Sequence, residues 1–262
     1  MTICAFLSHA GSADTLKLEI PANTHRWCPP GMFFANLTIL HITVEHHALV
    51  PFLSTHKAIT NLSLGACGCR TSCPLQGIVL PHLAYLVCPP GCVRGLLNNN
   101  PVTDLVMKYQ SPEDMRFSTS TVVRQGPFLS TVPITRLHAD FDPTDSDFLL
   151  FLFKIAPDLQ ILYLRQSVWC YSARVSRPIW RRQVDLFKDL SLLDISINDE
   201  LAPTKHDEDA YLRTLLPPLP AFILRGRLLN FLRVSTRLRE DSWYDRQWNI
   251  VDTTWTKTVN HE

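Results

Sequence analysis

The sequence lacks any apolar run long enough to cross a membrane. The densest apolar run, FLLFLF at residues 148–153, falls far short of the ~20 residues that a membrane-spanning helix needs. The opening residues MTICAFL have no basic segment and only a short apolar stretch, unlike a secretory signal peptide. We therefore expect an intracellular protein, cytoplasmic or nuclear, without a membrane partner.

A strong excess of charge of either sign is also missing. The 262 residues carry a formal net charge of +1, which argues against a nucleic-acid-binding protein that relies on global basic charge and against an acidic disordered chain. The hydrophobic content of 46% suffices for a buried core. Since no Gly/Ser linker or block of charge divides the chain, we predict a single domain over residues 1–262.

Motifs of common active sites are absent. The chain contains no G-x-S-x-G, P-loop, G-x-G-x-x-G or H-E-x-x-H motif. Several histidines fall in expected loops or helices, where the pattern gives them no fixed partner; they are His9, His25, His46, His47, His56 and His206. We predict a protein that is not an enzyme and needs no cofactor.

One nine-residue segment recurs in degenerate form along the chain. ITNLSLGAC, residues 59–67, matches L-x-x-L-x-L-x-x-C with Ile first, the strand segment of a leucine-rich repeat. Copies follow at intervals of 19 to 32 residues, compared with ~20–29 in the usual repeats. The positions predicted to be equivalent to Leu62 are Leu16, Leu40, Leu86, Leu105, Leu137, Leu162, Leu193 and, less well matched, Phe222.

These copies predict a stack of short strands. Leu62 and Leu64 point to one face of a strand and Ser63 to the other, and a single unit cannot bury its apolar face without neighbours. We predict an α/β fold, an irregular leucine-rich-repeat solenoid with a parallel sheet on its concave side and helices and loops on its convex side. The repeats would span residues 16–225, between an N-terminal cap at 1–15 and a C-terminal cap at 226–262.

Amphipathic patterns between the expected strands predict helices. The clearest are residues 46–57 and residues 148–155, the latter preceded by the acidic stretch TDSD that is typical of a capped helix start. Further helices are expected within residues 178–190 and 207–216. Residues 110–132 and 198–208 are polar and irregular, so we expect long loops there.

Most of the chain resembles a known family, with a weaker match over the C-terminal half. FLSHAGSADTLKLEI at residues 6–20, the segment from LTILHI to LSLGAC at 37–67, and LPHLAYLVCPP at 80–90 are similar to the repeat region of fungal F-box/leucine-rich-repeat proteins. In that family the F-box docks the protein onto a cullin-type ubiquitin ligase, and the repeats hold the substrate. The repeats begin here almost at Met1 with no F-box before them, so the resemblance implies only the substrate-recognition part. A ligase scaffold is expected as a partner only if an F-box is supplied.

The better functional candidate is therefore a protein-binding surface. Residues between the buried leucines of each strand point to the concave face. In the middle repeats these residues include Arg and Tyr, which are enriched at binding hot spots, together with an acid. The candidate set is Arg136, His138, Asp140, Tyr163 and Arg165. The alternatives are a free-standing or truncated repeat protein unrelated to ubiquitin transfer, and a zinc-stabilised nucleic-acid binder.

That last alternative depends on two features. Cys67, Cys69 and Cys73 lie within seven residues, and with a downstream residue they could supply four zinc ligands. The downstream candidates are His82, completing the preferred set, and Cys88 and Cys92. The spacing lacks paired C-x2-C motifs, so we expect buried thiols and no stoichiometric zinc. Arginines alternate with tryptophans after Arg225, but acidic residues are mixed in, so a cap with Trp inward is expected and nucleic acid is not.

Overall fold

The computed structural model describes residues 11–20, 32–67, 72–110, 114, 119, 129–142, 144–167, 183–184, 186–197, 231–239, 242–251 and 254–261. Residues 197, 231–239, 242–251 and 254–261 are described by their backbone alone. The chain divides into two compact units. Unit 1 comprises residues 1–117 with 128–133, and unit 2 comprises residues 118–127 with 134–262.

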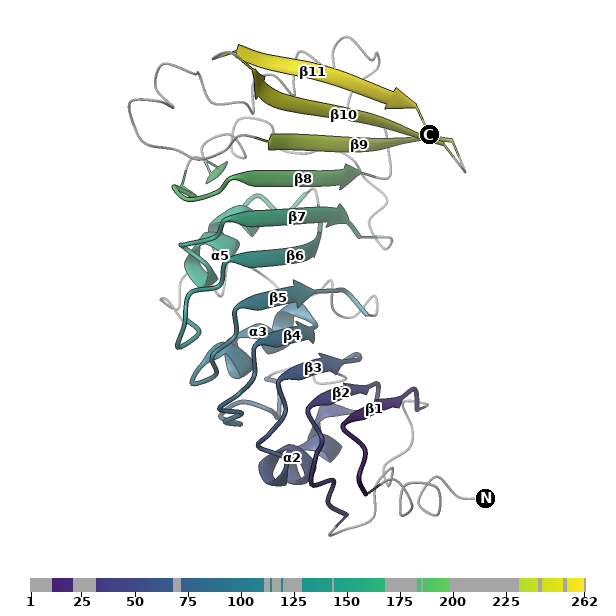
Figure 1. The fold of residues 1–262 in the computed structure, drawn as a ribbon, viewed down its shortest axis with the longest axis vertical. Helices are drawn as coiled ribbons and strands as arrows, with labels where there is room; N and C mark the ends of the chain where they lie inside the picture. Colours follow the sequence, from purple (N-terminus) through teal and green to yellow (C-terminus); the bar gives the residue numbers. More distant parts are fainter. Residues whose placement is uncertain are drawn as a thin grey trace. The chain divides into compact units, whose positions relative to one another are not determined.

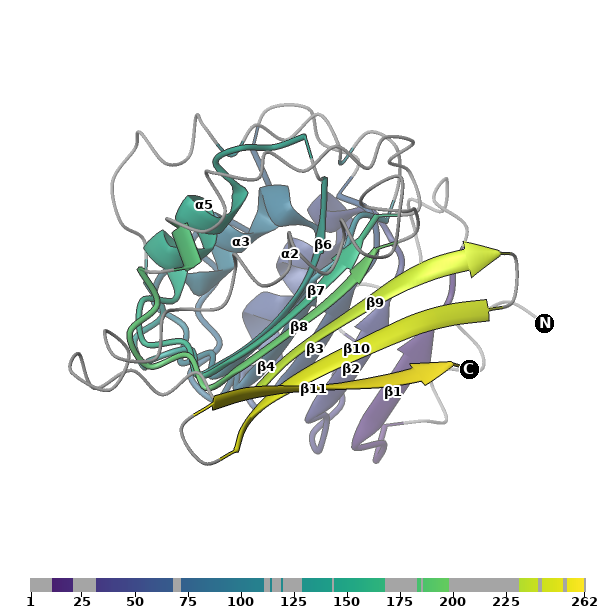
Figure 2. The same cartoon turned by 90° about the horizontal axis from the view of Figure 1, so that it is seen from above.

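Unit 1 contains five short strands paired in parallel in chain order (Figure 1). They are β1 (Thr15–Leu18), β2 (Ile39–Ile42), β3 (Asn61–Leu64), β4 (Tyr85–Cys88) and β5 (Asp104–Met107). The register aligns Leu16, Leu40, Leu62, Leu86 and Leu105 across all five strands, as predicted. Helices α2 (His46–Thr55) and α3 (Pro90–Leu97) lie on the same side of these strands (Figure 2).

Unit 2 repeats this arrangement and then departs from it. Strands β6 (Arg136–Phe141), β7 (Ile161–Gln166), β8 (Leu192–Ile197) and β9 (Phe231–Arg239) pair in parallel, and α5 (Phe148–Ile155) connects β6 to β7. Strands β10 (Ser242–Val251) and β11 (Thr254–His261) then continue antiparallel from β9. The register aligns Leu137, Leu162 and Leu193 as predicted, but the next position is Leu232. The predicted ninth position, Phe222, lies outside the described residues.

One hydrogen-bond pattern joins successive strands. Two residues before the aligned leucine, a carbonyl accepts two consecutive N–H groups from the next repeat; the Thr38 carbonyl, for example, accepts from Thr60 at 2.8 Å and Asn61 at 3.1 Å. The same double contact occurs at the carbonyls of Asp14, Thr60, Ala84, Thr135 and Gln160. Hydroxyls at this position bond to the same carbonyls, as Thr60 Oγ1 does to Thr38 at 3.2 Å. The pattern holds the start of each strand in register with its neighbour.

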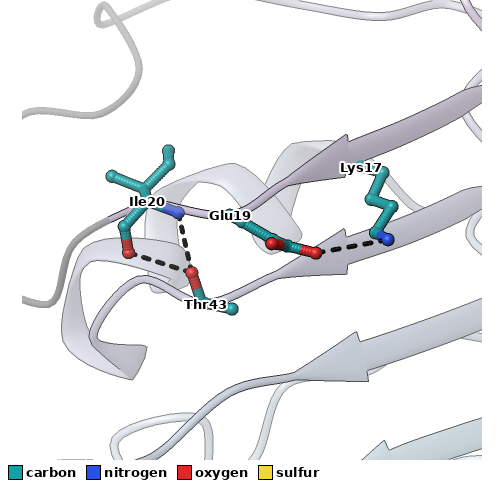
Figure 3. A network of polar contacts seen from close by, with 4 residues as sticks. All are labelled: Lys17, Glu19, Ile20 and Thr43. Carbon is teal, nitrogen blue, oxygen red and sulfur yellow. Dashed lines mark hydrogen bonds and ion pairs between the residues drawn. The ribbon is translucent and has the colours of Figure 1, made fainter.

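Thr43 extends the contact between repeats beyond the strands. Its Oγ1 accepts a hydrogen bond from the Ile20 N–H at 2.8 Å and donates one to the Ile20 carbonyl at 2.9 Å (Figure 3). Gly65 holds the equivalent position in the next repeat, and a Cβ there would lie 2.8 Å from the Thr43 Cα. The neighbouring backbone therefore leaves room only for glycine at position 65.

The observed elements confirm part of the sequence prediction. The α/β class, the parallel strands and the helices within 46–57 and at 148–155 are confirmed. The expected side-chain cap is wrong, because Asp147 makes no capping hydrogen bond to α5. Helix α3 was not predicted, and the segment expected to form a terminal cap contains β9, β10 and β11. Residues 207–216 lie outside the described residues, as do 178–182 and 185. The helix expected within 178–190 is wrong for its last part, because residues 183–184 are helical but residues 186–190 are not. None of the helices in the described parts of the chain has the length and apolarity to cross a bilayer.

Candidate functional site

The predicted binding residues lie on one face of β6 and β7. Along β6, Leu137, Ala139 and Phe141 are buried, and Phe141 contacts Phe148 of α5 with ring centroids 6.1 Å apart. Because side chains alternate along a strand, Arg136, His138 and Asp140 lie on the face opposite α5. Tyr163 and Arg165 of β7 share that face, since they pair in register with His138 and Asp140. We call His138, Asp140, Tyr163 and Arg165 the β6–β7 face.

Two contacts across the strands organise the β6–β7 face. The rings of His138 and Tyr163 stack with centroids 4.2 Å apart and an interplanar angle of 18°. Beside them, Arg165 Nε donates a hydrogen bond to Asp140 Oδ1 at 3.0 Å, and its Nη2 lies 3.0 Å from the same oxygen. Four of the five predicted residues are thus brought into two adjacent pairs. The fifth, Arg136, is exposed and sits opposite Ile161 in the register.

Burial differs sharply within the Arg165–Asp140 pair. The Asp140 side chain is only 9% exposed, whereas the Arg165 side chain is 59% exposed. A buried carboxylate requires a compensating cation and hydrogen bonds, and Arg165 supplies both. Arg165 thereby holds a fixed position while its outer edge stays open to solvent. Tyr163 is half-buried and pairs with Asp194 of β8 on its other side.

The predicted metal ligands are only partly together. Cys67 and Cys73 are buried and adjacent, but Cys69 lies outside the described residues, and His82 is exposed and not grouped with them. Cys92, one of the downstream candidates, and His46, which was not predicted as a ligand, complete the group. The ligand atoms of His46, Cys67, Cys73 and Cys92, all buried, lie within 4.8 Å of one another. We call these four residues the Cys3His cluster; all belong to unit 1.

His46 is held in a defined orientation at the start of α2. Its Nε2 lies 3.1 Å from the Gly65 carbonyl oxygen, which can only accept a hydrogen bond, so Nε2 carries the proton. Nδ1 is left with its lone pair toward the sulfurs, 3.3 Å from Cys73 Sγ and 3.4 Å from Cys92 Sγ. The expectation that His46 has no fixed partner is therefore wrong. It is also wrong for His56, whose Nε2 accepts a hydrogen bond from the Phe34 N–H at 2.9 Å.

The three sulfurs of the cluster perturb one another. Hydrogen bonds from Cys67 and Cys92, and a backbone hydrogen bond at Leu75, outweigh burial and lower the pKa of the Cys73 thiol to about 4. Hydrogen bonding to Cys67 and Cys73, together with burial, raises the pKa of Cys92. Burial raises the pKa of nearby Cys88, which is not one of the four.

A repeat-based signal in the sequence could have identified His46 and selected Cys92 among the downstream candidates. His46 follows the aligned Leu40 by six residues, and Cys92 follows the aligned Leu86 by six residues. The two thus hold equivalent positions in the repeats on either side of the one that contains Cys67. Local spacing around Cys67 could not reveal this, because stacking of the repeats brings the residues together.

Comparison with known proteins places the chain in no family. The fold defines it as an α/β protein with parallel strands. No protein-family model matches, and searches of the curated proteins and of the solved structures found no significant match.

Proposed function

We propose that the chain is a leucine-rich-repeat solenoid that binds a protein partner through the β6–β7 face, without catalysis. Its architecture is supported by the aligned leucines, the parallel pairing in chain order and the recurring double hydrogen bond to one carbonyl. The face of the strands turned away from the helices would then be the concave binding side.

The observation that carries the proposal is the pair of contacts on the β6–β7 face. The stack of His138 on Tyr163 and the pairing of Arg165 with Asp140 hold these side chains in place before a partner arrives, which lowers the entropic cost of binding. Tyr and Arg are also the residue types that most often dominate binding energy. Arg165 uses the donors of Nε and Nη2 on Asp140, and its guanidinium has further N–H groups for a partner.

The chemistry of this face favours an acidic partner segment. Arg136 and Arg165 are exposed, whereas Asp140 is buried. A peptide or loop with a carboxylate facing Arg165 and an apolar group facing Tyr163 would complement both charge and shape. By the resemblance to F-box proteins, the partner would be a substrate of a cullin-type ubiquitin ligase; a free-standing repeat module is the alternative.

The first experiment is affinity purification of the natively expressed protein with quantitative mass spectrometry. Cullin-ligase scaffold subunits among the enriched proteins would support the adaptor role. One specific partner without them would support a free-standing module. The most enriched protein is then purified, and its Kd for the full chain is measured.

The double substitution Tyr163→Ala/Arg165→Gln tests the β6–β7 face. The introduced glutamine amide could still donate a hydrogen bond to Asp140, so the fold should survive. We expect the Kd for the purified partner to rise about tenfold or more, because a hot-spot aromatic and a charge contact are removed together. Lys17→Ala/Glu19→Ala is the matched control, since it removes an exposed ion pair of 3.2 Å at β1 (Figure 3). An unchanged Kd for the first variant, with an unchanged circular dichroism spectrum, would contradict the proposed face.

A further inference from the structure

We propose that the Cys3His cluster in unit 1 binds one zinc ion as a structural site. The four donors are His46 Nδ1 and the sulfurs of Cys67, Cys73 and Cys92. This inference is independent of the proposed binding function, and it replaces the expectation of no stoichiometric zinc. Of the four ligands, only His46 was not among the candidates that the local sequence spacing suggested.

The distances within the cluster fit a tetrahedral zinc site. With Zn–S bonds of ~2.3 Å and Zn–N bonds of ~2.0 Å, neighbouring donors of a tetrahedron lie about 3.5–3.8 Å apart. His46 Nδ1 lies 3.3 Å from Cys73 Sγ and 3.4 Å from Cys92 Sγ, and no two of the four donor atoms are more than 4.8 Å apart. Small movements of the side chains would place all four around one ion.

The surroundings of the donors fit a metal as well. Zinc-binding histidines commonly donate their second ring N–H to a carbonyl, which fixes the tautomer and the orientation of the ring. His46 does this with the Gly65 carbonyl at 3.1 Å, so its Nδ1 lone pair faces the sulfurs. The backbone N–H of Leu75 bonds to Cys73, as is favourable for a thiolate ligand.

The donor set selects the kind of metal and the kind of site. Thiolate sulfur and imidazole nitrogen suit zinc and exclude calcium and magnesium, which prefer oxygen. Four protein donors, all buried, fill the tetrahedron and leave no position for a substrate. The site therefore stabilises structure.

The stack of repeats explains how the donors meet. His46 is the first residue of α2, which follows β2, and Cys92 lies in the first turn of α3, which follows β4. Cys67 follows β3, the strand between β2 and β4, and Cys73 lies six residues later in the same repeat. Zinc would thus link three successive repeats on the side where α2 and α3 lie.

Metal content and cobalt substitution of the unmodified full chain test the proposal. We expect about one zinc ion per chain after purification under reducing conditions. We also expect cobalt(II) to give the visible bands of a tetrahedral site together with sulfur-to-cobalt charge transfer. Removing the metal with a chelator should lower Tm by roughly 5 °C or more, and zinc, but not magnesium, should restore it. Folded protein that holds no zinc and gives no cobalt–sulfur bands after reconstitution would overturn the proposal, and so would a disulfide between any two of Cys67, Cys73 and Cys92 in the native chain.

Single substitutions identify the ligands. Cys73→Ser and Cys92→Ser should lose most of the bound zinc, whereas Cys88→Ser and His82→Ala should retain it. Cys88 is the closest control, because it is buried beside the cluster without belonging to it. If a ligand variant does not fold, its cobalt spectrum is replaced by thiol counting on the unmodified chain, where zinc should protect three thiols until a chelator is added. Equal loss of zinc from the Cys88 and Cys92 variants, or the absence of any thiol protection, would contradict the assignment.

Discussion

At the residue scale, Asn100 shows how one polar side chain replaces missing backbone partners. The residue is fully buried just beyond α3. Its Oδ1 accepts a hydrogen bond from the Leu80 N–H at 2.6 Å, and its Nδ2 donates to the carbonyls of Ile78 at 3.0 Å and Leu96 at 2.6 Å. Asn100 therefore satisfies backbone groups in the loop before β4 and at the end of α3.

Replacing Asn100 should be costly for stability. Asn100→Ala would remove three hydrogen bonds and leave buried backbone groups without partners, so we expect the free energy of unfolding to fall by roughly 2–4 kcal/mol. Asn98→Ala is the control, because Asn98 is exposed at the end of the same helix. Urea denaturation of both variants measures the difference. Equal stability of the two would show that water or local rearrangement satisfies the groups that Asn100 contacts.

At the element scale, the strands were predictable and the segments between them were less so. In a strand, buried and exposed side chains alternate, and this alternation is visible in the sequence. The aligned leucines of eight strands could therefore be located from the L-x-x-L-x-L pattern alone. Helix α3 was not predicted; its start lies at Pro89 and Pro90, and paired prolines commonly mark a turn or loop. Proline is also well suited to the first position of a helix, and Pro90 occupies that position here. Ser or Thr stands two positions before several of the aligned leucines and bonds to the preceding repeat. The sequence prediction did not use this recurrence.

The close approach of successive repeats can be tested at Gly65. A Cβ at this position would meet the Thr43 Cα at 2.8 Å, so Gly65→Ala must push two backbone segments apart. We expect a loss of about 1–3 kcal/mol in the free energy of unfolding. Gly11→Ala is the control, since a Cβ there meets nothing within 4 Å. Thermal unfolding of the two variants should differ clearly; identical Tm values would mean that the repeats adjust at no cost.

At the scale of the whole molecule, features that depend on contacts between distant segments could not be predicted from the sequence. His46 and Cys92 are 46 residues apart, and only stacking brings them together. The β6–β7 face could be predicted because period-two alternation and the repeat register suffice to locate it. Strand β9 continues the register, and LNFLRV at 229–234 fits the repeat pattern but was not recognised. Strands β10 and β11 are antiparallel and depart from the pattern, so the repeat could not predict them. The division into two compact units does not test the prediction of a single domain, which stays a prediction.

Thr119 tests the division into units. Residues 118–127 belong to unit 2 although the chain before and after them belongs to unit 1. Thr119 Oγ1 lies 2.7 Å from both carboxylate oxygens of Asp145, whose pKa is raised mainly by burial. Thr119→Val should therefore destabilise unit 2 by roughly 1–3 kcal/mol, because the half-buried Asp145 carboxylate loses one of its hydrogen-bond donors and keeps the Asp147 N–H.

Hydrogen exchange with mass spectrometry locates the effect of this substitution. Peptides from β6 and β7 should exchange faster in the Thr119 variant, and peptides from β2 to β4 serve as the internal reference. Thr144→Val is the matched control, since Thr144 bonds to Asp142 at 2.7 Å at an exposed position. Faster exchange confined to β2–β4 would contradict the assignment of Thr119 to unit 2.

The unequal spacing of the aligned leucines has a consequence for how such a chain can change over generations. The interval is 19 residues from Leu86 to Leu105 and 31 from Leu162 to Leu193, yet in both places the strands pair leucine to leucine. Insertions and deletions between strands can therefore accumulate without disturbing the ladder. Descendants of one ancestor would then diverge in length faster than in architecture. Sequence alignment would fail to detect their relationship while their strands could still be superimposed.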